Sequence, residues 1–171
     1  MQNVEFKAEL RDPSLARVIC QRAQAVRVGE VRQTDTYYRI PEGRLKKREA
    51  EGEPVEYVFY HRADRVRPAI SQFTIYSEDD AKKRFGQLPL PVWLTVRKTR
   101  EIWIHRNARI HLDHVESLGW FLEIEALVSP TNNVGRCHTV LARIREMLTP
   151  AVGEPIATSY ADLIANEPER A

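Results

Sequence analysis

The chain has 171 residues, a length that fits one domain spanning residues 1–171 with a sizeable core. Its 26 lysines and arginines nearly balance 24 acidic residues, and the formal charge of +2 argues against a protein that coats nucleic acid or an anionic membrane. The N-terminal stretch is charged and the sequence has no long apolar run, which predicts neither a signal peptide nor a membrane span. The two cysteines, Cys20 and Cys137, are far apart, which predicts neither a disulfide framework nor a structural zinc site. We therefore expect a cytoplasmic protein.

The first part of the chain predicts a strand, a helix and two further strands. Residues 4–10 alternate between apolar and charged side chains, which is the period of a strand. Asp12 and Pro13 are typical of a helix start, and we expect a helix from there to residue 25. The β-branched and aromatic residues at 31–40 and the alternation at 44–50 predict two more strands, separated by a turn.

The rest of the chain predicts mostly strands joined by short connections. We expect strands at 55–62, 70–77, 92–105, 109–115 and 120–128. We also expect a short helix that begins at Ser77 and ends near Gly86, and two further helices at 131–148 and 160–165. About eight strands with a few helices favour an α+β protein, in which an eight-stranded antiparallel sheet closes into a β-barrel with helices packed outside.

Charged residues alternate with apolar ones on several of these strands, and two arrangements fit this pattern. The charges could form the wet outer faces of the strands, which is the ordinary meaning of such alternation. In the other arrangement they line a polar lumen, and the apolar faces pack against amphipathic helices outside. We favour the polar lumen because the helices need an apolar sheet surface to cover, and because most carboxylates lie on different strands from the basic clusters.

Two sets of basic residues form ladders along strands. Arg44, Lys46 and Arg48 are each two residues apart, so in a strand their side chains project from one face. Lys98 and Arg100 repeat the pattern later in the chain. A triphosphate needs several lysine and arginine donors that converge from different directions, and these ladders supply them.

Carboxylates accompany the basic ladders on other strands. Glu123 and Glu125 share a strand face, and Asp113 and Glu5 could supply further oxygens. Hard divalent cations such as Mg²⁺ prefer oxygen ligands from carboxylates, phosphates and water. A lumen that contains acids and bases together is what a metal–triphosphate site requires. By contrast, the five histidines have no zinc-like spacing, and we expect no histidine-based metal site.

A series of short motifs runs in a fixed order over nearly the whole chain. Residues 3–7 read Asn-Val-Glu-Phe-Lys, and further motifs lie at 33–38, 43–49, 96–100, 109–119, 121–125 and 159–163. The ordered set resembles the CYTH family, also called triphosphate tunnel metalloenzymes, which includes class IV adenylyl cyclases and thiamine triphosphatases. That family's hallmark is Glu-x-Glu-x-Lys on the first strand, and here Asn3 stands in place of the first glutamate.

The resemblance implies an eight-stranded tunnel with a polar interior and assigns roles to individual residues. It implies Mg²⁺ or Mn²⁺ binding by Glu5, Asp113, Glu123 and Glu125. It implies triphosphate binding by Lys7, Arg44, Lys46, Arg48, Lys98, Arg100 and Arg109, with Arg65 or Arg67 as a further basic residue. We expect Lys7, Glu123 and Glu125 to act in catalysis. Asn3 removes one metal carboxylate and is expected to weaken metal binding.

The function expected from these residues is a metal-dependent phosphohydrolase that acts on tripolyphosphate, thiamine triphosphate or ATP. Positioning a terminal phosphoryl group for attack by water demands less than the adenine pocket of a cyclase. A class IV-type adenylyl cyclase that makes cyclic AMP is the first alternative, and a non-catalytic triphosphate-binding module is the second. An RNA-binding barrel is disfavoured by the near-neutral charge. The oligomeric state stays open, with a homodimer among the options.

Overall fold

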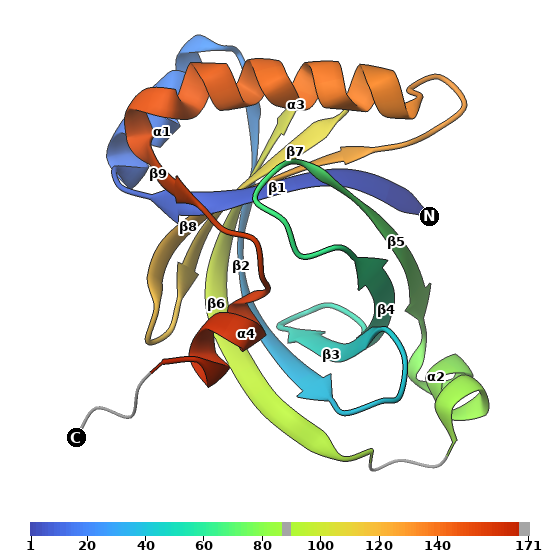
Figure 1. Cartoon of the computed structure of the whole chain (residues 1–171). Coiled ribbons are helices and arrows are strands. Elements are labelled where there is room, and N and C mark those ends of the chain that lie inside the picture. The colour runs from blue at the N-terminus through green and yellow to red at the C-terminus, as the bar shows by residue number, and fades with distance from the viewer. Residues whose placement is uncertain (87–89, 168–171) are drawn as a thin grey trace.

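The backbone of the computed structural model, which describes residues 1–86 and 90–167, is dominated by one closed sheet (Figure 1). The strands are β1 (Gln2–Leu10), β2 (Val26–Tyr38), β3 (Arg44–Ala50), β4 (Glu56–Arg62), β5 (Ala69–Tyr76), β6 (Val92–His105), β7 (Ala108–Val115), β8 (Gly119–Leu127) and β9 (Val152–Pro155). They follow the order β5-β4-β3-β2-β6-β7-β8-β1, and β1 also pairs with β5, which closes an eight-stranded antiparallel barrel. The predicted α+β barrel is therefore confirmed.

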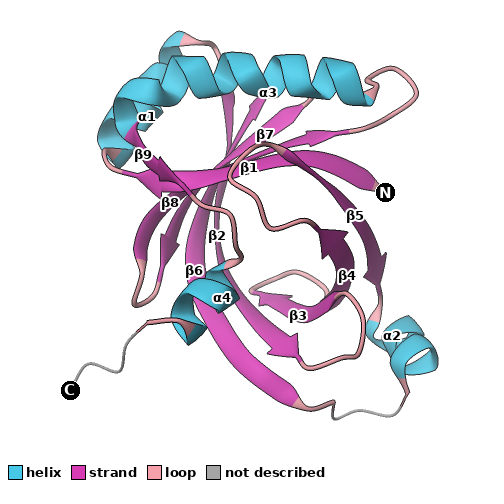
Figure 2. Cartoon of the chain, viewed as in Figure 1, coloured by secondary structure: helices cyan, strands magenta, loops and turns pink. Residues whose placement is uncertain are grey.

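Helices pack on the outside of this barrel (Figure 2). Those among the described residues are α1 (Pro13–Arg22), α2 (Glu78–Phe85), α3 (Val134–Leu148), α4 (Tyr160–Ala165) and the 3-10 turn Thr149–Ala151. Polar residues cap the N-termini of α1 and α2, as expected. Asp12 accepts a hydrogen bond from the Leu15 N–H, and Ser77 accepts one from the Asp80 N–H. No described helix is both long enough and apolar enough to cross a membrane.

The apolar faces of the strands point outward, toward the helices. Val4 and Phe6 of β1 lie in one buried cluster with Leu141 and Ile144 of α3, which crosses the top of the barrel in Figure 1. Each fully buried side chain of this size stabilises the fold by about 1.5–3 kcal/mol relative to its exposed state. The intervening polar residues of β1 consequently face the interior, so the polar lumen, rather than charged outer faces, is the arrangement that the chain adopts.

Two features differ from the expected elements. β2 starts at Val26, five residues earlier than residue 31, because its first half pairs with the far end of β6, from Val26 opposite Ile104 onward. β9 was not predicted because its four residues, Val-Gly-Glu-Pro, show no alternation; it forms only by pairing with the end of β1, where Leu10 lies opposite Val152.

Candidate functional site

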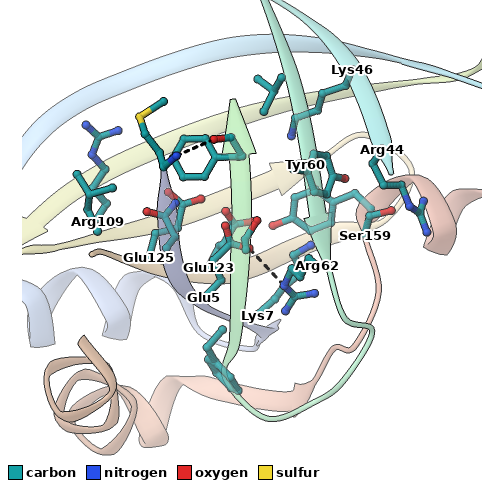
Figure 3. A pocket seen from close by; sticks show the side chains of 18 of the residues that line it. Glu5, Lys7, Arg44, Lys46, Tyr60, Arg62, Arg109, Glu123, Glu125 and Ser159 are labelled. Carbon is teal, nitrogen blue, oxygen red and sulfur yellow. Dashed lines mark hydrogen bonds and ion pairs between the residues drawn. The ribbon is translucent and has the colours of Figure 1, made fainter. Parts of the chain in front are cut away.

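The lumen of the barrel contains a cavity of about 520 Å³. Most of the residues singled out from the sequence line it: Glu5 and Lys7 of β1, Arg44, Lys46 and Arg48 of β3, Lys98 and Arg100 of β6, Arg109 of β7, and Glu123 and Glu125 of β8. Figure 3 shows several of these side chains converging on one space. Strands that are distant in sequence supply them because closure of the barrel brings their inner faces together.

Three glutamates form the acidic part of this cavity. Glu5 lies opposite Glu125 in the β1–β8 register, and Glu123 lies two residues along the same strand face (Figure 3). Burial and the negative charge of Glu123 raise the pKa of Glu125 well above its ordinary value. Burial opposes ionisation of Glu123 as well, but the nearby positive charges, that of Arg100 foremost and that of Lys7 with it, hold the Glu123 pKa well below its ordinary value. Within this pair, ionisation is therefore favoured at Glu123 over Glu125.

The basic part of the cavity is organised around a carboxylate that the sequence did not single out. Asp35 of β2 is fully buried and accepts hydrogen bonds from Arg48 Nε at 2.8 Å and Arg48 Nη2 at 2.7 Å. Lys98 Nζ donates to the same carboxylate at 2.9 Å, and Lys46 Nζ lies 3.4 Å from it. One internal anion thus holds three cavity cations close together before any ligand is bound.

Asp113, expected to be a metal ligand, is not among the residues that line the cavity. Its carboxylate accepts two hydrogen bonds from the Arg100 guanidinium, both at 2.8 Å, and a third from the Tyr160 hydroxyl at 2.7 Å. Asp113 thus holds the side chain of Arg100 in place, and Nη2 of Arg100 lies 3.6 Å from Glu123 Oε2. Asp113 therefore orients the guanidinium that faces the acidic group.

The segment before and within α4 contacts three further cavity cations. Lys7 Nζ donates to the Thr158 carbonyl at 3.3 Å, and Arg62 Nη1 donates to the Ala157 carbonyl at 3.1 Å. Arg44 forms an ion pair with Asp162, with Nη2 and Oδ2 3.0 Å apart. Burial lowers the pKa of Lys7, although nearby Glu123 opposes the shift. The C-terminal segment thereby borders one end of the cavity.

Arg62 is a further basic residue of the lumen, in place of the expected Arg65 or Arg67. Arg62 ends β4, lines the cavity, and places Nε 3.3 Å from Glu5 Oε2 (Figure 3). Arg65 and Arg67 lie in the exposed connection between β4 and β5, where Arg65 donates to the Pro68 carbonyl at 3.0 Å. The strand alternation, which turns Arg62 inward together with Tyr60, could have identified it.

Sequence reasoning also missed His111. It lies on β7 directly opposite Glu123, and only 3% of its surface is exposed. Donor atoms of His111, Glu123 and Glu125 all lie within 4.8 Å of one another. Burial and the neighbouring Arg100 lower the pKa of His111 to about 4, so the imidazole is neutral near pH 7. The signal was its spacing from Asp113, which puts both residues on the inner face of one strand.

This donor set fits a divalent cation. It contains two carboxyl groups, of which Glu123 ionises more readily than Glu125, and a neutral imidazole whose Nδ1 is buried and has no hydrogen-bond partner in the described part of the chain. The cations assembled around Asp35 lie in the same cavity. Chemically, the lumen can therefore hold a polyanion at its basic part beside a metal at its acidic part.

Comparison with known proteins agrees with this geometry. A family model described as CYTH domain matches residues 1–158. A Methanocaldococcus jannaschii protein, provisionally named as an adenylate cyclase, is 28% identical over 104 residues, which are 60% of this chain and 59% of that protein. The chain thus spans about three fifths of the length of that relative.

Solved structures with low sequence identity share the fold. The PH1012 protein of Pyrococcus horikoshii has a TM-score of 0.73 at 20% identity, covering 94% of this chain and 98% of that one. A Vibrio parahaemolyticus protein, again provisionally titled an adenylate cyclase, has a TM-score of 0.72 at 15% identity, covering 95% and 97% of the two chains.

Proposed function

The chain belongs to the CYTH family, a family with a triphosphate-binding fold, and from this premise we propose that it is a metal-dependent phosphohydrolase acting on an inorganic or organic triphosphate. The single observation that carries the proposal is the division of one cavity into a cationic part around Asp35 and an acidic part around Glu123. A triphosphate needs the first to bind, and a divalent metal needs the second.

The cations bind and orient the triphosphate. Lys46, Arg48 and Lys98 are held within reach of one carboxylate, so their donors converge on a volume that phosphate oxygens can share. Preorganisation of this kind lowers the entropy cost of binding and of reaching the transition state. Arg100 and Lys7 adjoin the acidic group, so we assign to them the oxygens nearest the scissile bond.

Glu123 and Glu125, with Glu5 beside them, are the residues proposed to hold Mg²⁺ or Mn²⁺. When bound there, such an ion neutralises charge on the phosphoryl group and lowers the pKa of a water molecule. Asp113 is proposed to act indirectly, because it meets the cavity through Arg100 and Tyr160, whose side chains it holds. Arg109, exposed on β7 at the rim of the cavity, is proposed as a peripheral triphosphate contact.

A class IV-type adenylyl cyclase is the second candidate. It is favoured by the provisional names of the Methanocaldococcus jannaschii and Vibrio parahaemolyticus proteins. A cyclase directs the ribose 3′-hydroxyl of ATP at the α-phosphorus and releases pyrophosphate, so it must also position the nucleoside. A hydrolase needs only the phosphate grip that the cavity cations supply, and we therefore place hydrolysis first.

A product assay distinguishes these activities. The full chain is incubated with Mg²⁺ or Mn²⁺ and with tripolyphosphate, thiamine triphosphate or ATP in separate reactions. Metal-dependent release of phosphate from at least one substrate is expected. Cyclic AMP with pyrophosphate would replace the hydrolase by the cyclase, and binding without any product would make the chain a triphosphate-binding module.

A variant ties the activity to the cavity. Replacing both Glu123 and Glu125 by glutamine is expected to abolish metal-dependent turnover, while circular dichroism shows that the barrel still folds. Glu116→Gln, at an exposed position in the turn between β7 and β8, is the matched control and is expected to keep full activity. Unchanged turnover in the double variant would contradict the assignment of the metal ligands.

A further inference from the structure

We propose that His111 is a nitrogen ligand of the divalent metal in the lumen, so that the site has mixed nitrogen and oxygen donors and prefers Mn²⁺ and Co²⁺ to Mg²⁺. The inference rests on the proposed function only in that it concerns the same metal site, at the acidic part of the cavity. It adds a ligand of a different chemical class, and with it a preference for transition-metal ions stronger than carboxylates alone would give.

The first support is an unsatisfied atom. Nδ1 of His111 is buried and has no hydrogen-bond partner within residues 1–86 and 90–167, although the side chain is only 3% exposed. A buried polar atom without a partner costs about 1–3 kcal/mol, so such atoms are rare unless they have a function. Ligation of a metal would satisfy it.

The second support is the distance to the neighbouring carboxylate. Nδ1 of His111 lies 3.7 Å from Oε1 of Glu123, which is too long for a hydrogen bond. Two atoms that each bind one ion at about 2.1 Å can be at most about 4.2 Å apart, so this pair already has a separation suited to a shared metal. The donor atoms of the whole group lie within 4.8 Å of one another, so side-chain movements of about 1 Å would bring them around one ion.

The third support is the rigid placement of the imidazole. His111 pairs with Glu123 across the β7–β8 ladder and with Ile102 across the β6–β7 ladder, both in the interior of the sheet. Ligands on such strands are positioned more accurately than ligands on loops. The ring therefore does not have to be recruited from elsewhere when a metal enters the acidic group.

Three cations beside the acidic part of the cavity oppose this assignment: Arg100 lies 3.6 Å from Glu123, Arg62 lies 3.3 Å from Glu5, and Lys7 is opposite Glu123 in the β1–β8 register. Asp113 counters the charge of Arg100, since it takes two hydrogen bonds from that guanidinium. Glu5 and Glu125 add acidic groups on the neighbouring strand positions. Together with Glu123, these carboxyl groups offset the neighbouring cations once a metal has displaced their protons, so a cation can enter next to His111.

Metal preference follows from the donor atom. Mg²⁺ favours oxygen ligands and dehydrates reluctantly, whereas an imidazole nitrogen is a good ligand for first-row transition ions. Affinity for a site with nitrogen donors rises from Mn²⁺ to Co²⁺. A lumen with His111 as a ligand should therefore bind Co²⁺ more tightly than Mn²⁺, and both more tightly than Mg²⁺.

The test is made on the full chain without triphosphate, so it does not depend on turnover. Pulsed electron paramagnetic resonance of the Mn²⁺-loaded protein is expected to show coupling to a directly bound ¹⁴N nucleus. Calorimetric titrations with Mg²⁺, Mn²⁺ and Co²⁺ are expected to give the stated order. In His111→Gln the ¹⁴N coupling disappears, and affinity for Mn²⁺ and Co²⁺ falls roughly tenfold or more, whereas Mg²⁺ affinity changes less.

His114→Gln is the control, because His114 lies on the same strand but packs against Trp120, with ring centroids 4.9 Å apart, and is exposed. It should keep the ¹⁴N coupling and all three affinities. Absence of ¹⁴N coupling in the unchanged protein overturns the proposal even if His111→Gln fails to fold. Coupling that persists in a folded His111→Gln, or equal losses for Mg²⁺ and Mn²⁺, overturns it as well.

The outcomes separate this inference from the proposed function. Nitrogen coupling without hydrolysis of any triphosphate would leave His111 as a metal ligand and refute the phosphohydrolase. Hydrolysis by a protein whose bound Mn²⁺ shows no nitrogen coupling would support the phosphohydrolase and refute His111 as a metal ligand.

Discussion

The carboxylate of Asp35 accepts two hydrogen bonds from the guanidinium of Arg48, at 2.8 Å and 2.7 Å, within the lumen of the barrel. Lys98 and Lys46 approach the same carboxylate from β6 and β3. Cations in a cavity repel one another strongly because little water screens them, and Asp35 offsets part of that repulsion. The chain can thus keep a cationic cavity folded while no ligand is present.

We expect Asp35→Asn to lower the free energy of unfolding by about 3–5 kcal/mol, because removing one partner leaves buried charges without compensation. Urea denaturation of the chain without ligand measures this. Glu49→Gln is the control: Glu49 also pairs with a lysine, Lys47 at 3.2 Å, but on the outside of β3, where such a pair contributes at most about 1 kcal/mol. Equal effects of the two substitutions would refute the role given to Asp35.

Lys46→Ala and Lys47→Ala test which face of β3 meets the triphosphate. Lys46 lines the cavity between the rings of Tyr37 and Tyr60, with Nζ 5.7 Å and 5.6 Å from their centroids, whereas Lys47 pairs with Glu49. Loss of one charge-assisted contact should weaken tripolyphosphate binding roughly tenfold or more in Lys46→Ala. In calorimetry, the affinity of Lys47→Ala for tripolyphosphate should stay within about twofold of that of the unchanged protein. Similar losses of affinity in both variants would refute the assignment.

The protonation of Lys98 predicts a dependence of binding on pH. Burial lowers the pKa of Lys98 to about 7, although Asp35 opposes the shift. Between pH 7 and the ordinary lysine value of 10.5 the folded chain holds fewer protons here than the unfolded chain, so this residue makes stability rise with pH across that window.

A bound triphosphate favours the charged ammonium of Lys98, so binding above pH 7 should take up a proton and weaken as the pH rises. Calorimetry at pH 8 in two buffers of different ionisation enthalpy measures the uptake directly. Lys98→Met should bind more weakly and without this uptake. Binding by the unchanged protein that takes up no proton at pH 8 would contradict the prediction.

Asn3→Glu tests whether the amide at this position weakens metal binding. Asn3 is 8% exposed, lines the cavity, and lies two residues before Glu5 on the same face of β1. An added carboxylate should tighten Mg²⁺ binding roughly tenfold, because affinity for hard cations follows the charge and number of oxygen ligands. Gln2→Glu is the control: it adds the same charge on the opposite face of β1 and should change the Mg²⁺ affinity little. If titrations with Mg²⁺ show no difference between the two variants, Asn3 is not what weakens metal binding.

Local sequence determined the elements and much of the inner face. Alternation in β1 separates Val4 and Phe6 from Glu5 and Lys7, and this period depends only on strand geometry, so it could be predicted without knowing the partners of the strand. The spacing of Arg44, Lys46 and Arg48 placed them on one face for the same reason. Cap residues such as Asp12 marked helix starts because their hydrogen bonds are made within a few residues.

The tertiary structure alone decided which residues meet inside the barrel. Asp35 and Lys98 are 63 positions apart, Asp113 and Tyr160 are 47 apart, and Arg44 and Asp162 are 118 apart; the first pair needs β2 to pair with β6, and the other two need α4 to dock on the barrel. Strand register and barrel closure likewise brought His111 to Glu123 and Arg62 to Glu5. The physical reason is that periodicity specifies the face on which a side chain lies, whereas its partner across the lumen depends on strand order and register, which non-local pairing sets.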